Sequence, residues 1–219
     1  MPSRLFPFGI SLSLMGCGGT PKGDTADDLK LWQGEHIQTL SFGADDNSEV
    51  IKVSPSGDVA ILVASKSRKV TLLDLSDHRL RTVAEETLFP DDTSESELTH
   101  IDLAPDGSFA AITRTLPITD ADGEQTDCRG ELVFVSIATE TFGEVLSQVA
   151  VGAMPDAVDI SPDGAWAVTA DEVDANDGKC TVPGVVPSIS ILTLMDGPQQ
   201  AEVALTLRME SEADKNLRE

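Results

Sequence analysis

The chain has 219 residues, of which 40% are hydrophobic and only 4% aromatic, and it contains no tyrosine. A total of 15 Lys and Arg against 38 Asp and Glu gives a formal net charge of −23 at pH 7. A chain of this length and apolar content can bury a core in one or two domains. The negative charge opposes contact with phosphate backbones and anionic lipid headgroups, so we expect no nucleic-acid partner.

The N-terminal segment is typical of an export signal. One basic residue, Arg4, precedes a mostly apolar stretch at 5–15, which is shorter than the roughly 20 apolar residues that span a bilayer. The stretch ends in Leu14-Met15-Gly16-Cys17, which resembles the lipobox of bacterial lipoproteins, where the cysteine is lipidated and becomes the mature N-terminus. The alternative is a chance cysteine in a glycine-rich start.

The lipobox resemblance implies a signal peptide at 1–16, lipidation of Cys17 and a polar tether at 17–34. By the same resemblance, Gly18 after the cysteine implies the outer membrane. A lipid chain attaches a protein to a membrane without a transmembrane helix. We therefore expect a lipid-anchored protein of the bacterial cell envelope, in contact with the membrane through its N-terminal lipid.

Residues 35–207 contain one repeated unit, at about 45–90, 95–150 and 151–207. Each unit holds a proline turn, and the three turns are Ser54-Pro55-Ser56-Gly57, Ala104-Pro105-Asp106-Gly107 and Ser161-Pro162-Asp163-Gly164. Proline presets φ for the turn, and the glycine two residues later tolerates the positive φ of a hairpin. The spacing of about 50 to 57 residues suits a propeller blade better than a helical repeat.

Four short strand-like segments make up each unit. They are 49–53, 59–64, 70–75 and 80–84 in the first, 98–103, 108–113, 131–137 and 141–149 in the second, and 157–160, 165–170, 188–194 and 201–207 in the third. The run after each turn is apolar on both faces, as expected of a strand that neighbouring blades cover. The sequence therefore predicts an all-β fold, a β-propeller-type array of about three four-stranded antiparallel blades.

Three units are too few to close a propeller, which takes about four to eight blades. The array is therefore expected to be an incomplete propeller, either part of a longer one or one whose open edges are covered by a partner chain or by the tail. Residues 36–42 form a candidate extra outer strand, and 208–219 a charged, helix-like tail.

The third unit resembles a known family of propellers. Its residues 151–164, VGAMPDAVDISPDG, resemble the signature of YVTN-type and lactonase-like propellers. The acidic loop at 170–178 and the strand at 188–192 resemble the choice-of-anchor I propellers of secreted bacterial proteins, some of which are fused to phosphatase or nuclease modules. The resemblance is close over 150–195 and general over 45–150. It implies a scaffold rather than an activity, and it carries no catalytic residue to this chain.

Two acidic loops interrupt the units after their second strands, so both should project from the same face. Carboxylate and amide oxygens are the ligands that calcium prefers, and the first loop resembles the opening of a calcium loop, although the full twelve-residue calcium pattern is absent there. The alternative is a pair of solvated turns. The candidate calcium ligands are Asp120, Asp122, Glu124, Asp127, Asp171, Asp174, Asn176 and Asp177.

Cys128 and Cys180 are the two thiols that remain once Cys17 is lipidated. They occupy matching insertions of neighbouring units, and export would place them where disulfides persist. We therefore expect a disulfide between them, against the alternative of two separate thiols. No other residue set indicates chemistry: the three histidines, His36, His78 and His100, share no zinc-ligand spacing, and the chain has neither a nucleophile elbow nor a phosphate-binding loop.

Two functional classes remain. The first is a membrane-anchored extracytoplasmic scaffold that binds an unknown protein or small-molecule ligand without catalysis. The second is a metal-dependent hydrolase of lactonase or phosphatase type, whose site would be completed by missing blades. A pocket with three or four converging carboxylates would favour the enzyme, and separate acidic loops on a flat face would favour binding.

Overall fold

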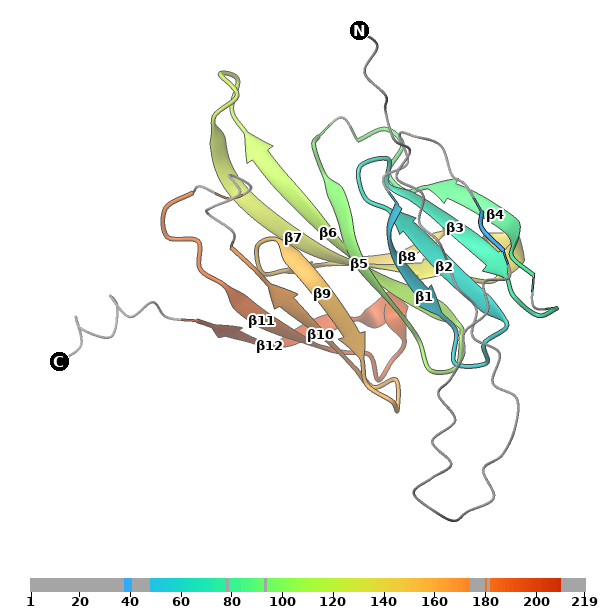
Figure 1. Cartoon of the computed structure of the whole chain (residues 1–219). Coiled ribbons are helices and arrows are strands. Elements are labelled where there is room, and N and C mark those ends of the chain that lie inside the picture. Colours follow the sequence, from blue (N-terminus) through green and yellow to red (C-terminus); the bar gives the residue numbers. More distant parts are fainter. Residues whose placement is uncertain are drawn as a thin grey trace, which may run out of the picture.

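The computed structural model describes residues 38–40, 48–77, 79–92, 94–173, 180 and 182–209. Within these ranges the chain forms three four-stranded antiparallel sheets and two short 3₁₀ helices (Figure 1). The predicted all-β array of three blades is confirmed, and the sheets do not close into a ring. The predicted signal peptide, tether and charged tail lie outside the described residues, except for Arg208 and Met209. No helix in the described part is long and apolar enough to cross a membrane.

Each sheet is an up-and-down meander, here called blade 1, blade 2 and blade 3. Blade 1 contains β1 (Ser48–Val53), β2 (Val59–Ala64), β3 (Lys69–Asp74) and β4 (Arg81–Thr87). Blade 2 contains β5 (Glu97–Leu103), β6 (Phe109–Thr119), β7 (Gln125–Ser136) and β8 (Val145–Val151), with η1 (Thr139–Thr141) before β8. Blade 3 contains β9 (Pro155–Ile160), β10 (Trp166–Asp171), β11 (Ser188–Thr193) and β12 (Glu202–Arg208), with η2 (Pro198–Gln200) before β12.

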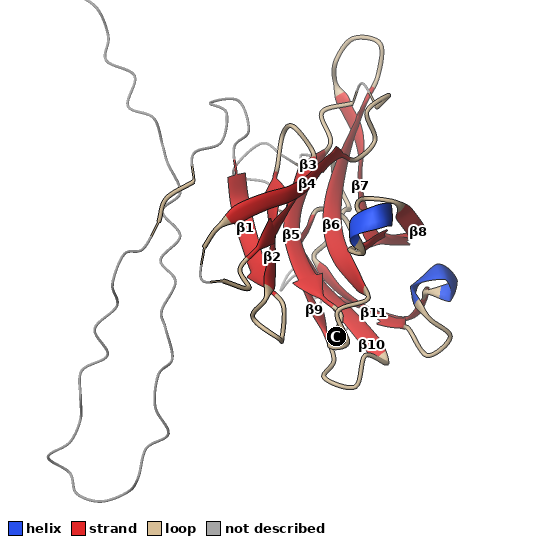
Figure 2. Ribbon diagram, turned by 90° about the vertical axis from the view of Figure 1, so that its right-hand side faces the viewer, coloured by secondary structure: helices blue, strands red, loops and turns tan. Residues whose placement is uncertain are grey.

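The proline turns join the first two strands of every blade. Gly57, Gly107 and Gly164 have φ values of 79°, 71° and 70°, the left-handed region that glycine enters without steric cost. In each turn the glycine N–H donates to the carbonyl three residues earlier, as in Gly57 to Ser54 at 2.9 Å. The first strands, β1, β5 and β9, lie next to one another along the inner side of the array (Figures 1 and 2).

The core lies between the blades, where facing sheets pack against each other, and blade 2 is covered in this way on both faces. Between blades 1 and 2, Ile61 and Val63 pack against buried residues that include Ile101 and Ile112. Between blades 2 and 3, Phe109 and Phe134 meet edge to face at a centroid distance of 5.8 Å, beside Val158, Ile160 and Leu192. Burying one such side chain contributes roughly 1.5–3 kcal/mol, so blade stacking is the main source of stability.

The far face of blade 1 is also covered. Ala60, Leu73, Leu75 and Leu80 form a buried cluster there, and Leu40 packs against it. The side-chain amide of Gln38 adds two hydrogen bonds of 3.1 Å with the backbone of Leu80, one as donor and one as acceptor. The segment before β1 therefore closes this end of the array.

The β6–β7 hairpin is longer than the sequence predicts. We expected strands at 108–113 and 131–137 with a loop between them, whereas pairing continues to Thr119 and Gln125. The extra residues include Thr115, Ile118, Thr119 and Thr126, whose β-prone side chains favour pairing across the hairpin even where they are exposed. The hairpin consequently projects beyond the array, at the upper left of Figure 1.

The junction of blades 2 and 3 leaves no room for a side chain at Gly130. A Cβ added there would lie 2.1 Å from the carbonyl oxygen of Gly152 and 2.4 Å from Cδ of Pro155. We therefore expect Gly130→Ala to lower the free energy of unfolding by about 1–3 kcal/mol through overpacking. The measurement is urea unfolding, with Gly123→Asn as control, because Asn tolerates positive φ and no atom lies within 4 Å there. Equal stabilities of the two variants would contradict this expectation.

Candidate functional site

A cavity of about 620 Å³ opens between blades 1 and 2, a volume within the usual range of ligand sites. Its walls come from the β2–β3 turn, the connection from β4 to β5, and the β6–β7 hairpin, which all lie toward the upper edge of the array in Figure 1. We call it the blade 1–2 cleft. Its lining includes two basic residues, two carboxylates and four hydroxyls: Lys66, Arg68, Glu95, Glu97, Ser94, Ser96, Thr115 and Thr119.

Arg68 holds one wall of the cleft in place. It lies in the β2–β3 turn with a φ of 54°, and only 14% of its side chain is exposed. Its guanidinium donates to the carbonyl of Asp92 at 2.9 Å and to that of Ser94 at 3.3 Å. A rigid five-donor fork suits this role, because one side chain can satisfy several carbonyls of an irregular segment.

Arg114 supports the same wall from blade 2. Its side chain, 7% exposed, forms ion pairs with Asp92 and, at 3.1 Å, with Glu131. The guanidinium also stacks 3.8 Å above the ring of Phe89. The loop from β4 to β5, which forms this wall of the cleft, is thus fixed by two arginines, one from each blade.

The carboxylate of Asp92 is stabilised in its charged form. Burial alone raises its pKa, but hydroxyl and N–H donation from Ser96 and Ser94, together with Arg114, holds the pKa well below the ordinary value. The distances are 2.6 Å from the Ser96 hydroxyl and 2.8 Å from both the backbone N–H and the hydroxyl of Ser94. The sequence analysis missed this network, although an arginine two residues after the apolar run 109–112 is an unusual residue at a position expected to be buried.

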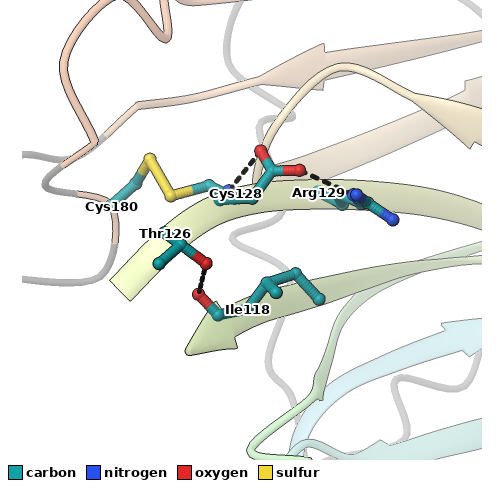
Figure 3. Close-up of a disulfide and its surroundings, with 6 residues drawn as sticks. Ile118, Thr126, Cys128, Arg129 and Cys180 are labelled. Carbon is teal, nitrogen blue, oxygen red and sulfur yellow. Dashed lines mark hydrogen bonds and ion pairs between the residues drawn. A yellow bond between two sulfur atoms is a disulfide. The ribbon is translucent and has the colours of Figure 1, made fainter. Parts of the chain in front are cut away.

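A disulfide joins β7 to the β10–β11 connection (Figure 3). Cys128 of β7, which lines the cleft, is bonded to Cys180 in the β10–β11 connection, with 5.9 Å between their Cα atoms. Both cysteines are buried. The bond ties the projecting hairpin of blade 2 to blade 3. The structure therefore contains the pairing that the sequence analysis expected.

The first acidic loop forms a compact turn. Asp120 accepts hydrogen bonds from the backbone N–H groups of Asp122 and Glu124, each at 3.0 Å. Asp127 belongs to strand β7 rather than to the loop, and its carboxylate accepts from Arg129 at 2.7 Å. Among the described residues, no group of three or more His, Cys, Asp and Glu side chains converges as a metal site.

The second acidic loop is described only in part. Asp174, Asn176 and Asp177 lie outside the described residues. Asp171 is the last residue of β10 and is 2% exposed. Its carboxylate accepts from hydroxyls at 2.6 to 2.9 Å and from the Gly152 N–H at 3.2 Å; the hydroxyls belong to Thr169, Ser188 and Ser190. These donors use the oxygens of Asp171 inside the junction of blades 2 and 3.

A second buried carboxylate, that of Asp102, lies where the inner strands of the three blades meet. Asp102 forms an ion pair with Lys52 at 2.7 Å and accepts the N–H of Ile160 at 2.7 Å. Burial raises its pKa, but the Lys52 contact and the N–H donors outweigh burial, so the pKa is below the ordinary value of 3.8. Asp102 thereby links all three blades at their inner strands.

The chain should lose stability in acid. Because Asp92 and Asp102 have lower pKa values in the folded than in the unfolded chain, their contribution is fully present above the ordinary pKa of 3.8 and is lost progressively as pH falls from 3.8 toward the lower pKa of the folded chain. Urea midpoints between pH 6 and pH 2.5 should therefore decrease, and Asp102→Asn should flatten the decrease. A midpoint that rises or stays constant below pH 4 would argue against this assignment.

Comparisons with known proteins agree on the architecture. Residues 49–217 match the choice-of-anchor I domain. Curated protein sequences give no significant match. The fold is similar to a protein from Lactobacillus plantarum, with a TM-score of 0.56 and 17% identity, over 82% of this chain and 50% of that one.

Two further solved structures are similar. The periplasmic gluconolactonase of Pseudomonas aeruginosa has a TM-score of 0.56 and 16% identity, over 79% of this chain and 43% of that one. A protein from Bacteroides uniformis, named as a candidate 6-phosphogluconolactonase, has a TM-score of 0.58 and 16% identity, over 85% and 47%. This chain spans half or less of the length of the three structures. At these identities the likeness concerns the fold alone.

Proposed function

We propose, since this chain belongs to the choice-of-anchor I domain family, that it is a cell-envelope scaffold that binds a small polar ligand in the blade 1–2 cleft. Family membership indicates a cell-surface or extracytoplasmic protein. The observation that carries the proposal is the cleft itself. It has the volume of a ligand site, and one of its walls, the loop from β4 to β5, is fixed by Arg68 and Arg114.

The lining of the cleft indicates the kind of ligand. Lys66 offers donors and the two glutamates offer acceptors, whereas two of the four hydroxyls, those of Ser94 and Ser96, already donate to Asp92. The described lining of the cleft contains two carboxylates, those of Glu95 and Glu97. A metal-dependent hydrolase would be favoured by three or four. This arrangement suits a hydroxylated small molecule with a charged group, held by several weak polar contacts.

Calorimetric titration with a panel of hydroxylated acids and amines, beginning with gluconate and glucosamine, tests the binding proposal. We expect Lys66→Ala and Glu97→Ala to weaken the binding of a ligand that the chain recognises. Arg79→Ala is the control, because Arg79 lies in the β3–β4 turn, at the opposite end of the sheet from the cleft. Binding that both cleft substitutions leave unchanged would contradict the proposal.

The alternative function is a lactonase-type hydrolase completed by further blades. It is supported by the neighbour named gluconolactonase, of which this chain spans 43%. Hydrolysis of glucono-1,5-lactone by the chain, dependent on added divalent metal and abolished by chelator, would favour it. A separate measurement tests the first acidic loop. If Asp120, Asp122 and Glu124 bind calcium, the temperature of thermal unfolding should be higher in millimolar calcium than in excess chelator.

Membrane attachment at Cys17 is the last part of the proposal. It is supported by the lipobox-like Leu14-Met15-Gly16-Cys17 and by the extracytoplasmic character of the family. Cys17→Ser should move the protein from the membrane fraction to the soluble fraction and leave an unprocessed precursor. A variant that is cleaved normally and still sediments with membranes would refute lipid attachment.

A further inference from the structure

The blade 1–2 cleft has two chemically different ends. One end is formed by the β2–β3 turn and the connection from β4 to β5, and it carries charged side chains, those of Lys66, Glu95 and Glu97. The other end is formed by the β6–β7 hairpin and the segment before β9, and its side chains are apolar, those of Pro117, Cys128 and Met154. A ligand that fills the cleft therefore meets charge at one end and apolar surface at the other.

Contacts with blade 3 fix the position of the apolar end. Cys128 is bonded to Cys180 of the β10–β11 connection, and Pro117 lies opposite Cys128 in the β6–β7 hairpin. The carbonyl of Met154 accepts the N–H of Glu172, which follows β10, at 3.1 Å. The charged end is tied instead to blade 1. The cleft therefore extends from blade 1, past the start of β5, toward blade 3.

The apolar side chains of this end are not part of the core. Among the described residues, the three apolar clusters that hold the blades together include neither Pro117 nor Met154. Both residues are half-buried, and Met154 has a φ of 52°, in the left-handed region that a side chain of its size rarely adopts. Methionine adapts its shape to an apolar partner. This end of the cleft thus presents apolar surface that blade packing does not use.

The charged end favours a cation. Arg68 is already engaged, because its guanidinium donates to backbone carbonyls of the connection from β4 to β5. Glu95 is exposed and Glu97 half-buried, and neither carboxylate forms an ion pair or accepts a hydrogen bond from the residues that the structure describes. The two carboxylates thus outnumber the single ammonium of Lys66. The net charge of −23 adds a negative potential that attracts cations.

We propose that the ligand of the cleft is an amphiphilic amine, with a hydroxylated and positively charged head at Glu95 and Glu97 and a short apolar chain against Pro117 and Met154. This inference rests on the proposed function, and it adds the sign of the charge on the head and the presence of the chain. Lys66 donates to hydroxyls of the head. A cavity of about 620 Å³ encloses a molecule of drug size, so the chain has a few carbons and the ligand is not a membrane lipid.

The experiment varies the apolar chain on a constant head. The full chain is titrated calorimetrically with N-methyl-, N-butyl- and N-hexyl-D-glucamine, which share a hydroxylated ammonium head. A buried methylene strengthens binding about threefold, so the butyl amine should bind at least about tenfold more tightly than the methyl amine. The heat capacity change of binding should become more negative as the chain lengthens. N-butyl-D-gluconamide, whose nitrogen is uncharged, should bind at least about fivefold more weakly than the butyl amine, because charge-assisted hydrogen bonds to the glutamates are lost.

Substitutions locate the chain and the head separately. Met154→Asn removes the apolar side chain and keeps a residue that tolerates positive φ, so it should weaken the butyl amine at least about fivefold and the methyl amine less than about twofold. Pro117→Thr, a β-prone replacement in the hairpin, should have the same selective effect. Met195→Asn is the matched control, because Met195 is 67% exposed in the connection from β11 to β12, at the other end of blade 3. Glu97→Gln should weaken all three amines by one factor.

A further control concerns the open face of blade 3, where an alkyl chain could adsorb without the cleft. Trp166 is 36% exposed there and Val168 38%. Val168→Glu should leave the affinities of all three amines unchanged. A chain-length dependence that Val168→Glu removes and Met154→Asn retains would place the chain on blade 3 and overturn the inference.

The remaining outcomes separate this inference from the proposed function. Equal affinities for the three amines, all weakened by Glu97→Gln, would overturn the apolar chain and leave the binding of a polar ligand intact. Equal binding of the butyl amine and the butyl amide would overturn the cationic head. No binding of any amine would overturn the inference as a whole, and the proposed function would fall with it only if the panel of hydroxylated acids also failed to bind.

Discussion

Replacing Arg114 by Met should lower the free energy of unfolding by about 3–5 kcal/mol, because it breaks a buried ion pair and leaves Asp92 charged and partly unpaired. Arg114 is 7% exposed in its side chain, Asp92 22% and Glu131 27%, so water can replace little of what the guanidinium donates. The substitution also removes the cation–π contact with Phe89. We expect this to be one of the two largest single effects outside the apolar core.

Urea unfolding at pH 7 measures the effect, and Arg129→Met is the matched control. Arg129 pairs with Asp127 at 2.7 Å, but its side chain is 67% exposed, so its removal should cost less than about 1 kcal/mol. Arg114→Lys should fall between the two, since an ammonium keeps the charge and loses the planar fork. A loss of under 1 kcal/mol for Arg114→Met would show that the network does not stabilise the wall of the cleft.

Removing the disulfide with Cys128→Ala and Cys180→Ala together should lower the free energy of unfolding by about 4 kcal/mol. The bond spans a sequence separation of 52 residues, and the chain-entropy model gives roughly this value for a loop of that length. Part of the effect should be local, because the bond connects the projecting β6–β7 hairpin to the β10–β11 connection beside the cleft.

The disulfide prediction has an internal control. Reductant should destabilise the unmodified chain by about as much as the double substitution does, and it should leave the doubly substituted chain unchanged. Two free thiols in the denatured, unreduced protein would contradict the bond. A reductant effect of equal size in both chains would mean that the stability loss has another cause.

The repeat made the fold predictable from the sequence. Apolar runs such as 59–64, bounded by a proline turn with a glycine at its end, determine both strand position and the two buried faces. All twelve expected segments overlap strands of the structure, within a few residues at most ends. The strand order also follows, because short turns join antiparallel neighbours.

The candidate site was not predictable in the same way. The cleft depends on how two blades pack, and the pairs that build it, Arg68 with Asp92 and Arg114 with Asp92, join residues more than twenty positions apart with no fixed spacing. Asp171 was read as a loop ligand because acidic residues follow it, yet it is drawn into the interior by the hydroxyls of neighbouring strands. Local sequence patterns thus predict turns and strands well, but they do not predict which side chains pair across an interface between blades.

The closed end at blade 1 and the open end at blade 3 give the array a direction. In a stack where each sheet touches only its neighbours, local opening begins where fewest contacts hold the last element. Amide hydrogens of β12, whose side chains are mostly exposed, should exchange first, and those of β5 and β6, covered on both faces, last. The Cys128–Cys180 bond holds the β10–β11 connection of blade 3 but does not hold β12, so β12 can open on its own. Protection of amide hydrogens from exchange should therefore decrease in steps from the middle of the chain toward its C-terminus.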